Sequence, residues 1–239
     1  FGNLFMAALS DILGSQKDAI AQTGKILRIS GTVIPVTYTN THLFAEYENG
    51  LVLNEEHFID EPKHDGTLKI KKVYLEPNGI ANPDALVAIE QADYILIGPG
   101  DLYTSILPNI LVEGISEAIK KSKAKTIYIL NLMTKYGQTL DFSARDHLNV
   151  LEKYMTNGKI DYILVNNSSL PAGVLKLYED MKEFPVEDDF VETDELKILR
   201  ENFVSSNTAE KSSSDTIRRS LIRHNPEKLA QEIMKIVEC

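Results

Sequence analysis

The sequence predicts an α/β fold with a parallel sheet and an inserted antiparallel block. Three short apolar runs rich in β-branched residues, at 94–97, 126–130 and 161–165, alternate with helical patterns. This order is typical of β-α units whose parallel strands are buried on both faces. Residues 25–75 instead alternate apolar and polar side chains, which indicates antiparallel strands with one solvated face. We therefore expect a three-layer α/β domain over residues 1–239, with a β-rich insertion at 25–75.

The chain is expected to begin with helices. Apolar side chains over residues 3–12 fall on one helix face, and helical character continues over residues 18–22 to a stop at Gly24. Phe1 stands inside this helical pattern, and no capping residue precedes it. We therefore expect the sequence to be N-terminally incomplete and to lack an upstream β-α-β portion.

The β-rich block follows. Strands are expected at residues 25–29, 32–37, 43–47, 51–53 and 69–75. Between the third and fourth of these, Glu48-Asn49-Gly50 is a hairpin signal, because asparagine and glycine tolerate the positive φ of a tight turn. Residues 62–66, which begin with proline and end with glycine, are expected to form a loop.

From residue 77 onward, strands and helices alternate. Helices are expected at residues 83–91, 112–121, 143–155 and 171–182, and a final amphipathic helix from Pro226. Ser143 is a good N-cap for its helix, and Leu86, Val87 and Ile89 are expected to face the core from theirs. Residues 187–215 are acidic at first and serine-rich later. They are expected to form a surface loop or insertion.

Composition narrows the functional classes. The net charge of −10 disfavours a general nucleic-acid or anionic-membrane surface, which needs a basic face. The single cysteine, Cys239, rules out an intrachain disulfide framework and fits a reducing, cytoplasmic setting. No apolar run approaches the roughly 20 residues of a membrane span. A homo-oligomer is compatible with these properties.

The turn after the run at 94–97 is the first candidate site. Gly98-Pro99-Gly100 stops the strand, and Asp101, Thr104 and Ser105 are good caps for a helical turn that follows at once. A strand, a glycine turn and a helix start place backbone N–H groups and a positive helix end at one spot, which favours an anion. The alternative is an ordinary β–α turn that uses glycine only for its geometry.

Polar residues also follow the other two parallel strands. Asn131 and Thr134 come after the second strand, and Asn166 and Ser168 come after the third. The carboxyl ends of parallel strands meet at one edge of a sheet, so these side chains are expected to line a ligand cleft. The alternative is that each residue only caps the next helix.

Two further groups of residues are candidates for a functional role. His147 beside Asp146 suits a general base, but a structural helix histidine is the favoured interpretation. Arg218, Arg219, Arg223 and His224 form either a phosphate-binding cluster or a solvated basic turn. The remaining histidines lack metal-ligand spacing, so no metal site is expected.

Six stretches of the chain form a recognisable set. They are G-N-L-F-M-A-A-L at 2–9, the strand pair around Gly31 and Pro35, I-G-P-G-D-L-Y-T-S-I-L-P-N at 97–109, N-L-M-T at 131–134, D-H-L at 146–148 and I-R-H-N-P-E-K-L-A at 222–230. The set resembles the CofD-like family, and within it the YvcK branch of gluconeogenesis factors. The resemblance covers residues 2–236 and is strongest over residues 98–109. It implies a Rossmann-like fold.

The resemblance also implies a function. The YvcK branch is associated with cell shape and wall synthesis on gluconeogenic carbon sources and with binding of UDP-sugars such as UDP-N-acetylglucosamine. A non-catalytic regulator that binds a nucleotide-sugar or a related phosphorylated small molecule is therefore expected, with no firm cofactor. Carried over position by position, its ligand residues would be Asn3, Gly98, Gly100, Asp101, Leu102, Tyr103, Thr104, Ser105, Asn131, Thr134, Tyr178 and Arg223.

The CofD branch of the same family supplies the alternative function. Its members are 2-phospho-L-lactate transferases, which join a phospholactyl group to a deazaflavin alcohol during coenzyme F420 biosynthesis and depend on Mg²⁺. Carboxylates are then needed to hold the metal ion, and Asp101 and Asp146 are the candidates near the cleft. The loop at 98–105 reads differently in that branch, which favours the regulator.

The sequence departs from the family pattern in three places. Asp101 stands where serine is common, and K-Y-G-Q-T at 135–139 replaces the usual Q-P-G-E-T. The family's N-terminal G-G-G-T-G motif is absent from this sequence. Part of the expected phosphate site therefore has no residue to which it can be assigned.

Overall fold

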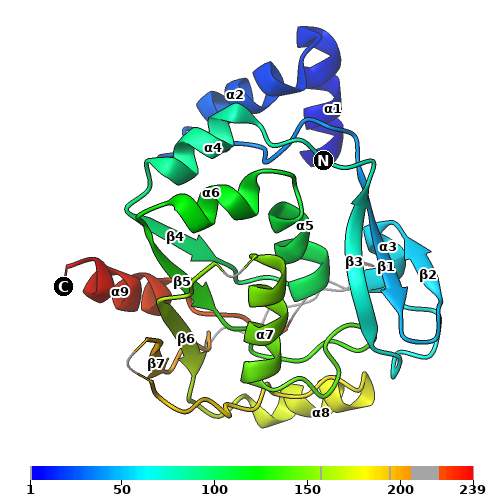
Figure 1. Ribbon diagram of the computed structural model, residues 1–239, viewed down its shortest axis with the longest axis vertical. Coiled ribbons are helices and arrows are strands. Elements are labelled where there is room, and N and C mark those ends of the chain that lie inside the picture. The colour runs from blue at the N-terminus through cyan, green and yellow to red at the C-terminus, as the bar shows by residue number, and fades with distance from the viewer. Residues whose placement is uncertain (1, 157, 194, 206–220, 239) are drawn as a thin grey trace. The chain divides into compact units, whose positions relative to one another are not determined.

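Residues 2–156, 158–193, 195–205 and 221–238 are described by a computed structural model (Figure 1). The chain divides into two units, Phe1–Val36 and Thr37–Cys239. Among the described residues, no helix is both long enough and apolar enough to cross a membrane. The later part of the expected serine-rich stretch, together with Arg218 and Arg219, lies outside the described residues.

The first unit begins with a pair of helices, α1 (Gly2–Leu13) and α2 (Gln16–Ile26). The helix predicted over residues 3–12 is thereby confirmed. The Ser15 side chain caps the second helix. Thr23 Oγ1 donates a hydrogen bond to the Met6 sulfur at 3.1 Å, which joins the two helices.

The predicted helix stop at Gly24 and the strands at 25–29 and 32–37 are wrong. Gly24 lies inside α2, where a Cβ would come within 3.2 Å of the Ile29 side chain. The absence of a side chain at Gly24 therefore serves packing and not helix termination. The Ile29 amide donates back to the Gly24 carbonyl at 3.2 Å, which is a turn closing the helix and not a sheet ladder.

The second unit contains an antiparallel sheet of three strands in the order β2-β1-β3. These are β1 (His42–Tyr47), β2 (Val52–Asn54) and β3 (Ile70–Glu76). The hairpin predicted between β1 and β2 is confirmed, and Gly50 supplies its positive φ of +84°. Leu43, Ala45 and Tyr47 are buried while the intervening side chains are more exposed, as the alternating pattern predicts.

The second unit also contains a sheet of four parallel strands in the order β4-β5-β6-β7. These are β4 (Tyr94–Ile97), β5 (Lys125–Ile129), β6 (Tyr162–Asn166) and β7 (Lys197–Glu201). The first three match the predicted runs in position. β5 and β6 are largely buried as predicted, but the burial predicted for β4 is wrong, because β4 is an edge strand of the described sheet and only Ile97 of it is buried. The parallel sheet predicted from the sequence is therefore confirmed, and the carboxyl ends of its strands share one edge.

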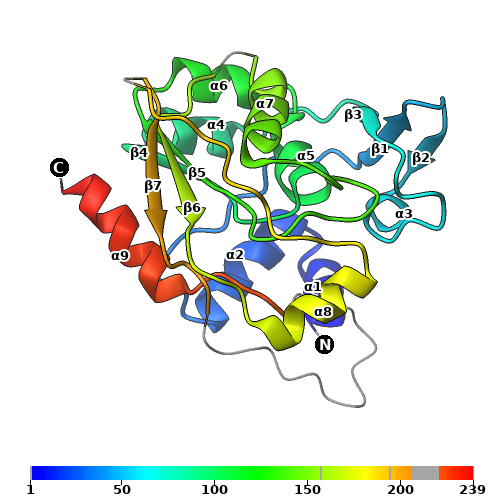
Figure 2. The ribbon, with the colours of Figure 1, turned by 90° about the horizontal axis from the view of Figure 1, so that it is seen from below.

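Helices connect the parallel strands and cover the sheet. The helical segments are α4 (Pro83–Glu90), the wide π-type turn η1 (Leu102–Ile106), α5 (Leu107–Ile110), α6 (Ile115–Lys121), α7 (Ala144–Tyr154), α8 (Ala172–Asp180) and α9 (Pro226–Val237). Figure 2 shows α6 and α7 on one face of the sheet and α9 on the other. The result is the expected three-layer arrangement.

Successive side chains of a strand point to opposite faces of the sheet, so apolar side chains reach the helices on both faces. Toward α9, Ile127 and Leu164 of the strands pack with Phe203, Leu229 and Ile236 in one buried cluster. The apolar stripe predicted for the last helix is thus confirmed. On α7, the helix predicted from Ser143 is also confirmed, and its capping box is complete.

Several predicted details differ from the structure. The helix expected from residue 112 begins three residues later, after Gly114 with a φ of +99°. On α4, Ala85 is buried and Val87 is exposed, so the predicted inward face is rotated. Within 187–215, expected to be a surface loop, residues 197–201 form β7, an edge strand whose apolar run was too short to be recognised.

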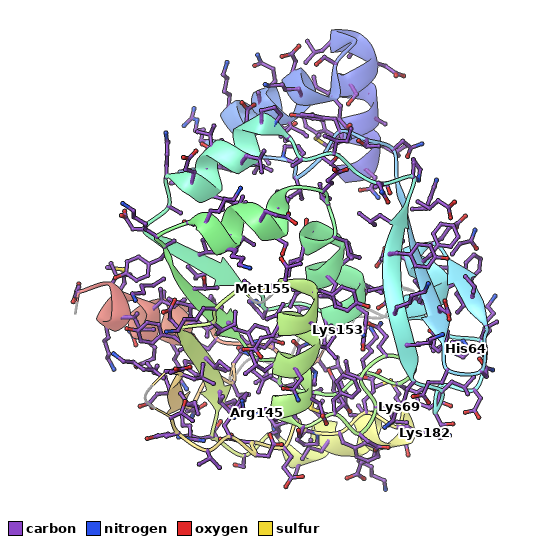
Figure 3. All side chains as sticks on the ribbon, viewed as in Figure 1. His64, Lys69, Arg145, Lys153, Met155 and Lys182 are labelled. Atoms are coloured by element: carbon purple, nitrogen blue, oxygen red, sulfur yellow. The ribbon has the colours of Figure 1, made fainter. Side chains whose placement is uncertain are left out.

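A second unpredicted element is α3 (Glu56–Asp60), between β2 and β3. Its five residues bury only Ile59, so no helical periodicity is visible in the sequence. The loop expected at 62–66 follows it. His64 of this loop, labelled in Figure 3, makes an edge-on contact with the Tyr47 ring of β1, with 4.5 Å between ring centroids.

The antiparallel sheet meets the segment after β5 at a tight joint. The Gly66 amide donates to Tyr136 Oη at 3.1 Å, and the Gly137 amide donates to the Gly66 carbonyl at 3.1 Å. A Cβ at Gly66 would overlap the Tyr136 ring. Lys182, just beyond α8 (Figure 3), also contacts this ring, with its Nζ 5.0 Å from the ring centroid.

We expect Gly66→Ala to lower the free energy of unfolding by about 1–3 kcal/mol, because the added methyl group must displace an aromatic ring in a filled joint. Chemical denaturation measures this change. Gly173→Ala is the matched control, since nothing lies within 4 Å of a Cβ at that position on α8. This control should be neutral or stabilise by up to about 1 kcal/mol. Equal effects of the two substitutions would contradict the packing described at the joint.

Candidate functional site

A cavity of about 760 Å³ lies in the second unit, beyond the carboxyl ends of β4 and β5. Its walls come from the segments after α3, β4 and β5, from α8 with the residues just beyond it, and from residues 221–224. The lining residues are Asp60, Glu61, Pro99, Gly100, Asp101, Asn131, Leu132, Met133, Thr134, Lys135, Leu177, Tyr178, Asp180, Met181, Glu183, Leu221, Ile222, Arg223 and His224. This is the position where open parallel sheets bind ligands.

Glycine at position 98 shapes the first wall. Gly98 has a φ of +85°, and a Cβ there would come 3.0 Å from the Ile129 carbonyl oxygen. Both facts require glycine, since other residues are strained at positive φ and would crowd the neighbouring strand. The chain can therefore turn sharply after β4 and bring Pro99, Gly100 and Asp101 onto the cavity wall.

The helical start that follows is a wide turn. The Asp101 carbonyl accepts hydrogen bonds from the amides of Ser105 and Ile106, at 2.9 and 3.0 Å. The bond from Ile106 is the i→i+5 bond of a π-type turn. The Asp101 side chain makes no capping hydrogen bond. The capping expected from the sequence is thus wrong for Asp101, because its carboxylate is engaged elsewhere.

That carboxylate pairs with Lys135, which lies after β5. Lys135 Nζ lies 3.1 Å from Asp101 Oδ2 and 2.9 Å from Asp60 Oδ1. Gln138 Nε2 also donates to Asp60 Oδ1 at 3.1 Å. A single ammonium therefore joins the end of α3, the turn after β4 and the segment after β5 at one wall of the cavity.

Burial and charge act in opposite directions in this group. Burial alone would raise the pKa of Asp60, but the adjacent Lys135 ammonium outweighs it and holds the pKa of that carboxyl below its usual value. Burial alone would lower the pKa of Lys135, yet Asp101 and Asp60 together raise it. Asp60 and Lys135 are therefore both charged at neutral pH.

Asn131 is the cavity residue with an unsatisfied polar atom. Its Oδ1 is buried and has no hydrogen-bond partner among the described residues. A buried carbonyl oxygen without a donor costs free energy, so the geometry favours a bound molecule that supplies one. Thr134 is different, since its Oγ1 accepts from the Phe184 amide at 2.9 Å and its own amide donates to the Phe184 carbonyl.

Residues 221–224 are held in place by two structural contacts. Tyr178 Oη accepts hydrogen bonds from the amides of Leu221 and Ile222, at 2.9 and 3.2 Å. A short antiparallel bridge then pairs Val204 with His224. The Tyr178 hydroxyl thus positions the segment that carries Arg223 onto the lining.

His224 stands on the lining as a neutral group. Its Nε2 lies 3.1 Å from the Leu130 carbonyl oxygen, which can only accept, so Nε2 carries the proton. Burial lowers the pKa of His224 to about 4, although the bond to Leu130 opposes this. The positive charge on the cavity lining therefore comes from Lys135 and Arg223.

The structure brings some of the twelve residues expected at the ligand site together and leaves others apart. Gly100, Asp101, Asn131, Thr134, Tyr178 and Arg223 share the cavity lining. Gly98, Leu102, Tyr103, Thr104 and Ser105 are not on it, and three of these, Leu102, Tyr103 and Thr104, are buried behind the wall. Asn3 belongs to the first unit, and its role stays a prediction.

The other candidates also lie off the lining. Asn166 Nδ2 donates to the Ser168 carbonyl and its Oδ1 accepts from the Phe203 amide, so it stabilises the chain after β6. His147 is fully buried, and its Nδ1 lies 2.9 Å from the Ser143 carbonyl oxygen. Asp146 completes the capping box of α7. Among the described residues, no group of three or more His, Cys, Asp or Glu side chains is arranged to hold a metal ion.

Sequence reasoning missed Lys135 and Asp60 as cavity residues, whereas it named His224 with Arg223 as part of either a phosphate-binding cluster or a solvated basic turn. Lys135 was visible as the one lysine near the end of a buried strand, in a segment that already departed from the family pattern. Asp60 offered no local signal, because it belongs to the unpredicted helix α3.

The chain is similar in sequence to a family model and to several known proteins. The family model of 2-phospho-L-lactate transferase CofD matches residues 1–204. The chain is 39% identical to a putative gluconeogenesis factor of Aquifex aeolicus over 241 residues, covering all of this chain and 70% of the relative. It is 37% identical to the gluconeogenesis factor of Bacillus subtilis, covering 99% and 71%. A putative gluconeogenesis factor of Thermotoga maritima is 41% identical, covering 98% and 71%.

A crystal structure of similar fold is known. A Bacillus halodurans protein of the UPF0052 family superposes with a TM-score of 0.83 at 34% identity, covering 98% of this chain and 71% of that protein. The α/β fold with its separate antiparallel sheet is therefore shared with that protein. The chain belongs to the CofD-like family, in the branch of the gluconeogenesis factors.

The buried histidine makes stability depend on pH. The pKa of His224 is about 4 in the folded protein and about 6.5 in an unfolded chain. The unfolded state binds the proton more readily, so stability is fully present above pH 6.5 and falls as the pH drops toward 4. The loss from this group is about 3 kcal/mol over that window.

We expect His224→Gln, which keeps an N–H donor for Leu130, to flatten this dependence. Chemical denaturation between pH 7.5 and 4.5 gives the slope of the unfolding free energy, which should decrease by up to about 1 kcal/mol per pH unit relative to the wild type. A variant with the full wild-type slope would show that His224 is not the group responsible.

Proposed function

We propose that this protein is a gluconeogenesis factor, a non-catalytic cytoplasmic regulator that binds a nucleotide-sugar such as UDP-N-acetylglucosamine and supports cell shape and wall synthesis on gluconeogenic carbon sources. The observation that carries the proposal is the cavity beyond β4 and β5, which offers the Arg223 guanidinium and Asn131 Oδ1, an atom without a hydrogen-bond partner among the described residues, to one ligand. Relatives named gluconeogenesis factor, at 37–41% identity along the chain, support it.

The size and chemistry of the cavity support a ligand of this class. Small-molecule sites commonly enclose about 300–1,000 Å³ and combine apolar walls with a few polar groups. Here Leu132, Met133 and Ile222 supply apolar surface. Asn131 Oδ1 would accept a hydrogen bond from an N–H or O–H of the base or the sugar, and Arg223 would pair with phosphate oxygens.

The family model's own name is that of a transferase, which makes 2-phospho-L-lactate transfer the second candidate function. Such an enzyme would need carboxylates to hold Mg²⁺ near the transferred phosphoryl group. Asp60, Glu61 and Asp101 are the carboxylates on the wall formed by the end of α3 and the turn after β4. Asp60 and Asp101 are engaged by the Lys135 ammonium, which favours the regulator. Incubation with a deazaflavin alcohol, an activated phospholactate and Mg²⁺ tests the transferase, and product formation would establish it.

We expect UDP-N-acetylglucosamine to raise the thermal midpoint of the intact protein. At a ligand concentration one hundred times Kd, the native state gains about 2.7 kcal/mol, which corresponds to a rise of about 5–10 °C for a domain of this size. Differential scanning fluorimetry measures it. Arg223→Ala should remove most of this rise, because the guanidinium no longer offsets the phosphate charge.

Arg145→Ala is the control for the arginine substitution. Arg145 lies on α7 against the Phe190 ring, with 4.6 Å from Cζ to the ring centroid, and is not on the cavity lining (Figure 3). Its ligand-induced shift should equal that of the wild type. No shift of the wild-type midpoint at millimolar ligand would refute nucleotide-sugar binding.

A further inference from the structure

The cavity lining is rich in carboxylates for a site proposed to hold phosphate. Five acidic side chains stand on it, Asp60, Glu61, Asp101, Asp180 and Glu183, together with two cations, Lys135 and Arg223. His224 adds no positive charge at neutral pH, because burial lowers its pKa to about 4. An anionic ligand therefore needs some of the acidic charge to be cancelled locally.

The Lys135 ammonium cancels part of that acidic charge. It lies within 3.1 Å of carboxylate oxygens of both Asp60 and Asp101, and its side chain is 21% exposed. Arg223 is solvent-exposed, on the wall formed by residues 221–224. Lys135 is also fixed from behind, since its amide donates to Thr139 Oγ1 at 2.9 Å. The backbone that carries Lys135 is thus held in place, and the two ion pairs position the ammonium.

The neutralised carboxylate belongs to the glycine turn itself. Asp101 follows Gly100 directly, and both stand on the wall. An ionised Asp101 without a partner would repel phosphate oxygens from this turn. Paired with Lys135, the turn presents a wall of lower net charge and a fixed shape.

We propose that Lys135 is a positioning residue that determines specificity, because by pairing with Asp60 and Asp101 it allows the acidic cavity to accept the phosphates of a nucleotide-sugar. This inference rests on the proposed function. Lys135 acts on the ligand's charge and not on its base or sugar. Its removal therefore weakens binding of a nucleoside diphosphate sugar more than binding of the uncharged nucleoside.

Isothermal titration of the intact protein with UDP-N-acetylglucosamine and with uridine tests this. For Lys135→Met we expect at least a tenfold higher Kd for the nucleotide-sugar and less than a twofold change for uridine. Lys135→Met leaves the carboxylates of both Asp60 and Asp101 without their ammonium, and adding Asp101→Asn in the same chain removes one of these two charges. The net charge of the group then equals that of the wild type, so the double variant should bind the nucleotide-sugar within about threefold of the wild type. A merely structural role for Lys135 would affect both ligands alike and would not be rescued.

Lys125→Met is the matched control. Lys125 also forms an ion pair, with Asp161 at 3.4 Å, but it lies at the start of β5 and not on the lining. Its Kd values should equal those of the wild type. Thermal midpoints of all variants establish that each is folded, and if Lys135→Met alone does not fold, the comparison of the double variant with the wild type decides.

The outcomes separate the two proposals. A wild-type protein that does not bind UDP-N-acetylglucosamine overturns the proposed function and this inference with it. Wild-type binding that is unchanged in Lys135→Met overturns the inference alone. An equal loss of uridine binding in Lys135→Met also overturns the inference alone. The same holds for a double variant whose Kd for the nucleotide-sugar is more than tenfold higher than that of the wild type.

Discussion

The ion pairs made by Lys135 connect three of the segments that form the cavity in the second unit. One ammonium reaches Asp101 after β4 and Asp60 at the end of α3, while its own backbone belongs to the segment after β5. Partly buried ion pairs contribute little net stability, because desolvation offsets attraction, but they penalise any arrangement that separates them. The group therefore defines the geometry of the wall more than it stabilises the fold.

Much of the parallel sheet could be predicted from the sequence. The runs that became β4, β5 and β6 are short, apolar and bounded by turn residues. Burial on both faces leaves that pattern in β5 and β6, whereas in β4 only Ile97 is buried. Because the carboxyl ends of parallel strands meet at one edge of a sheet, Asn131 and Gly100 could be expected to lie near each other without tertiary information. The errors fall where the local sequence pattern carries little information about secondary structure. They concern the helix that continues through Gly24, the five residues of α3, and the edge strand β7.

The site was predicted less completely because its key contacts join distant segments. Asp60 and Lys135 are far apart in the sequence, and the helix that carries Asp60 has no recognisable period. Local reasoning assigned Asp101 to helix capping, whereas an ammonium from another strand end competes successfully for its carboxylate. Residues such as Leu102 and Tyr103 adjoin the cavity wall in sequence, yet their side chains fill the core behind it.

The joint between Gly66 and Tyr136 has a consequence for how such proteins can diverge. The ring occupies the space that any side chain at position 66 would need, and its hydroxyl accepts a hydrogen bond from the amide at the same position. A larger residue at 66 therefore requires a smaller one at 136. Position 136 directly follows Lys135, so a larger residue at 66 without a smaller one at 136 would displace the segment that carries Lys135 and, with it, the charged wall of the cavity. We therefore expect positions 66 and 136 to change together in evolution.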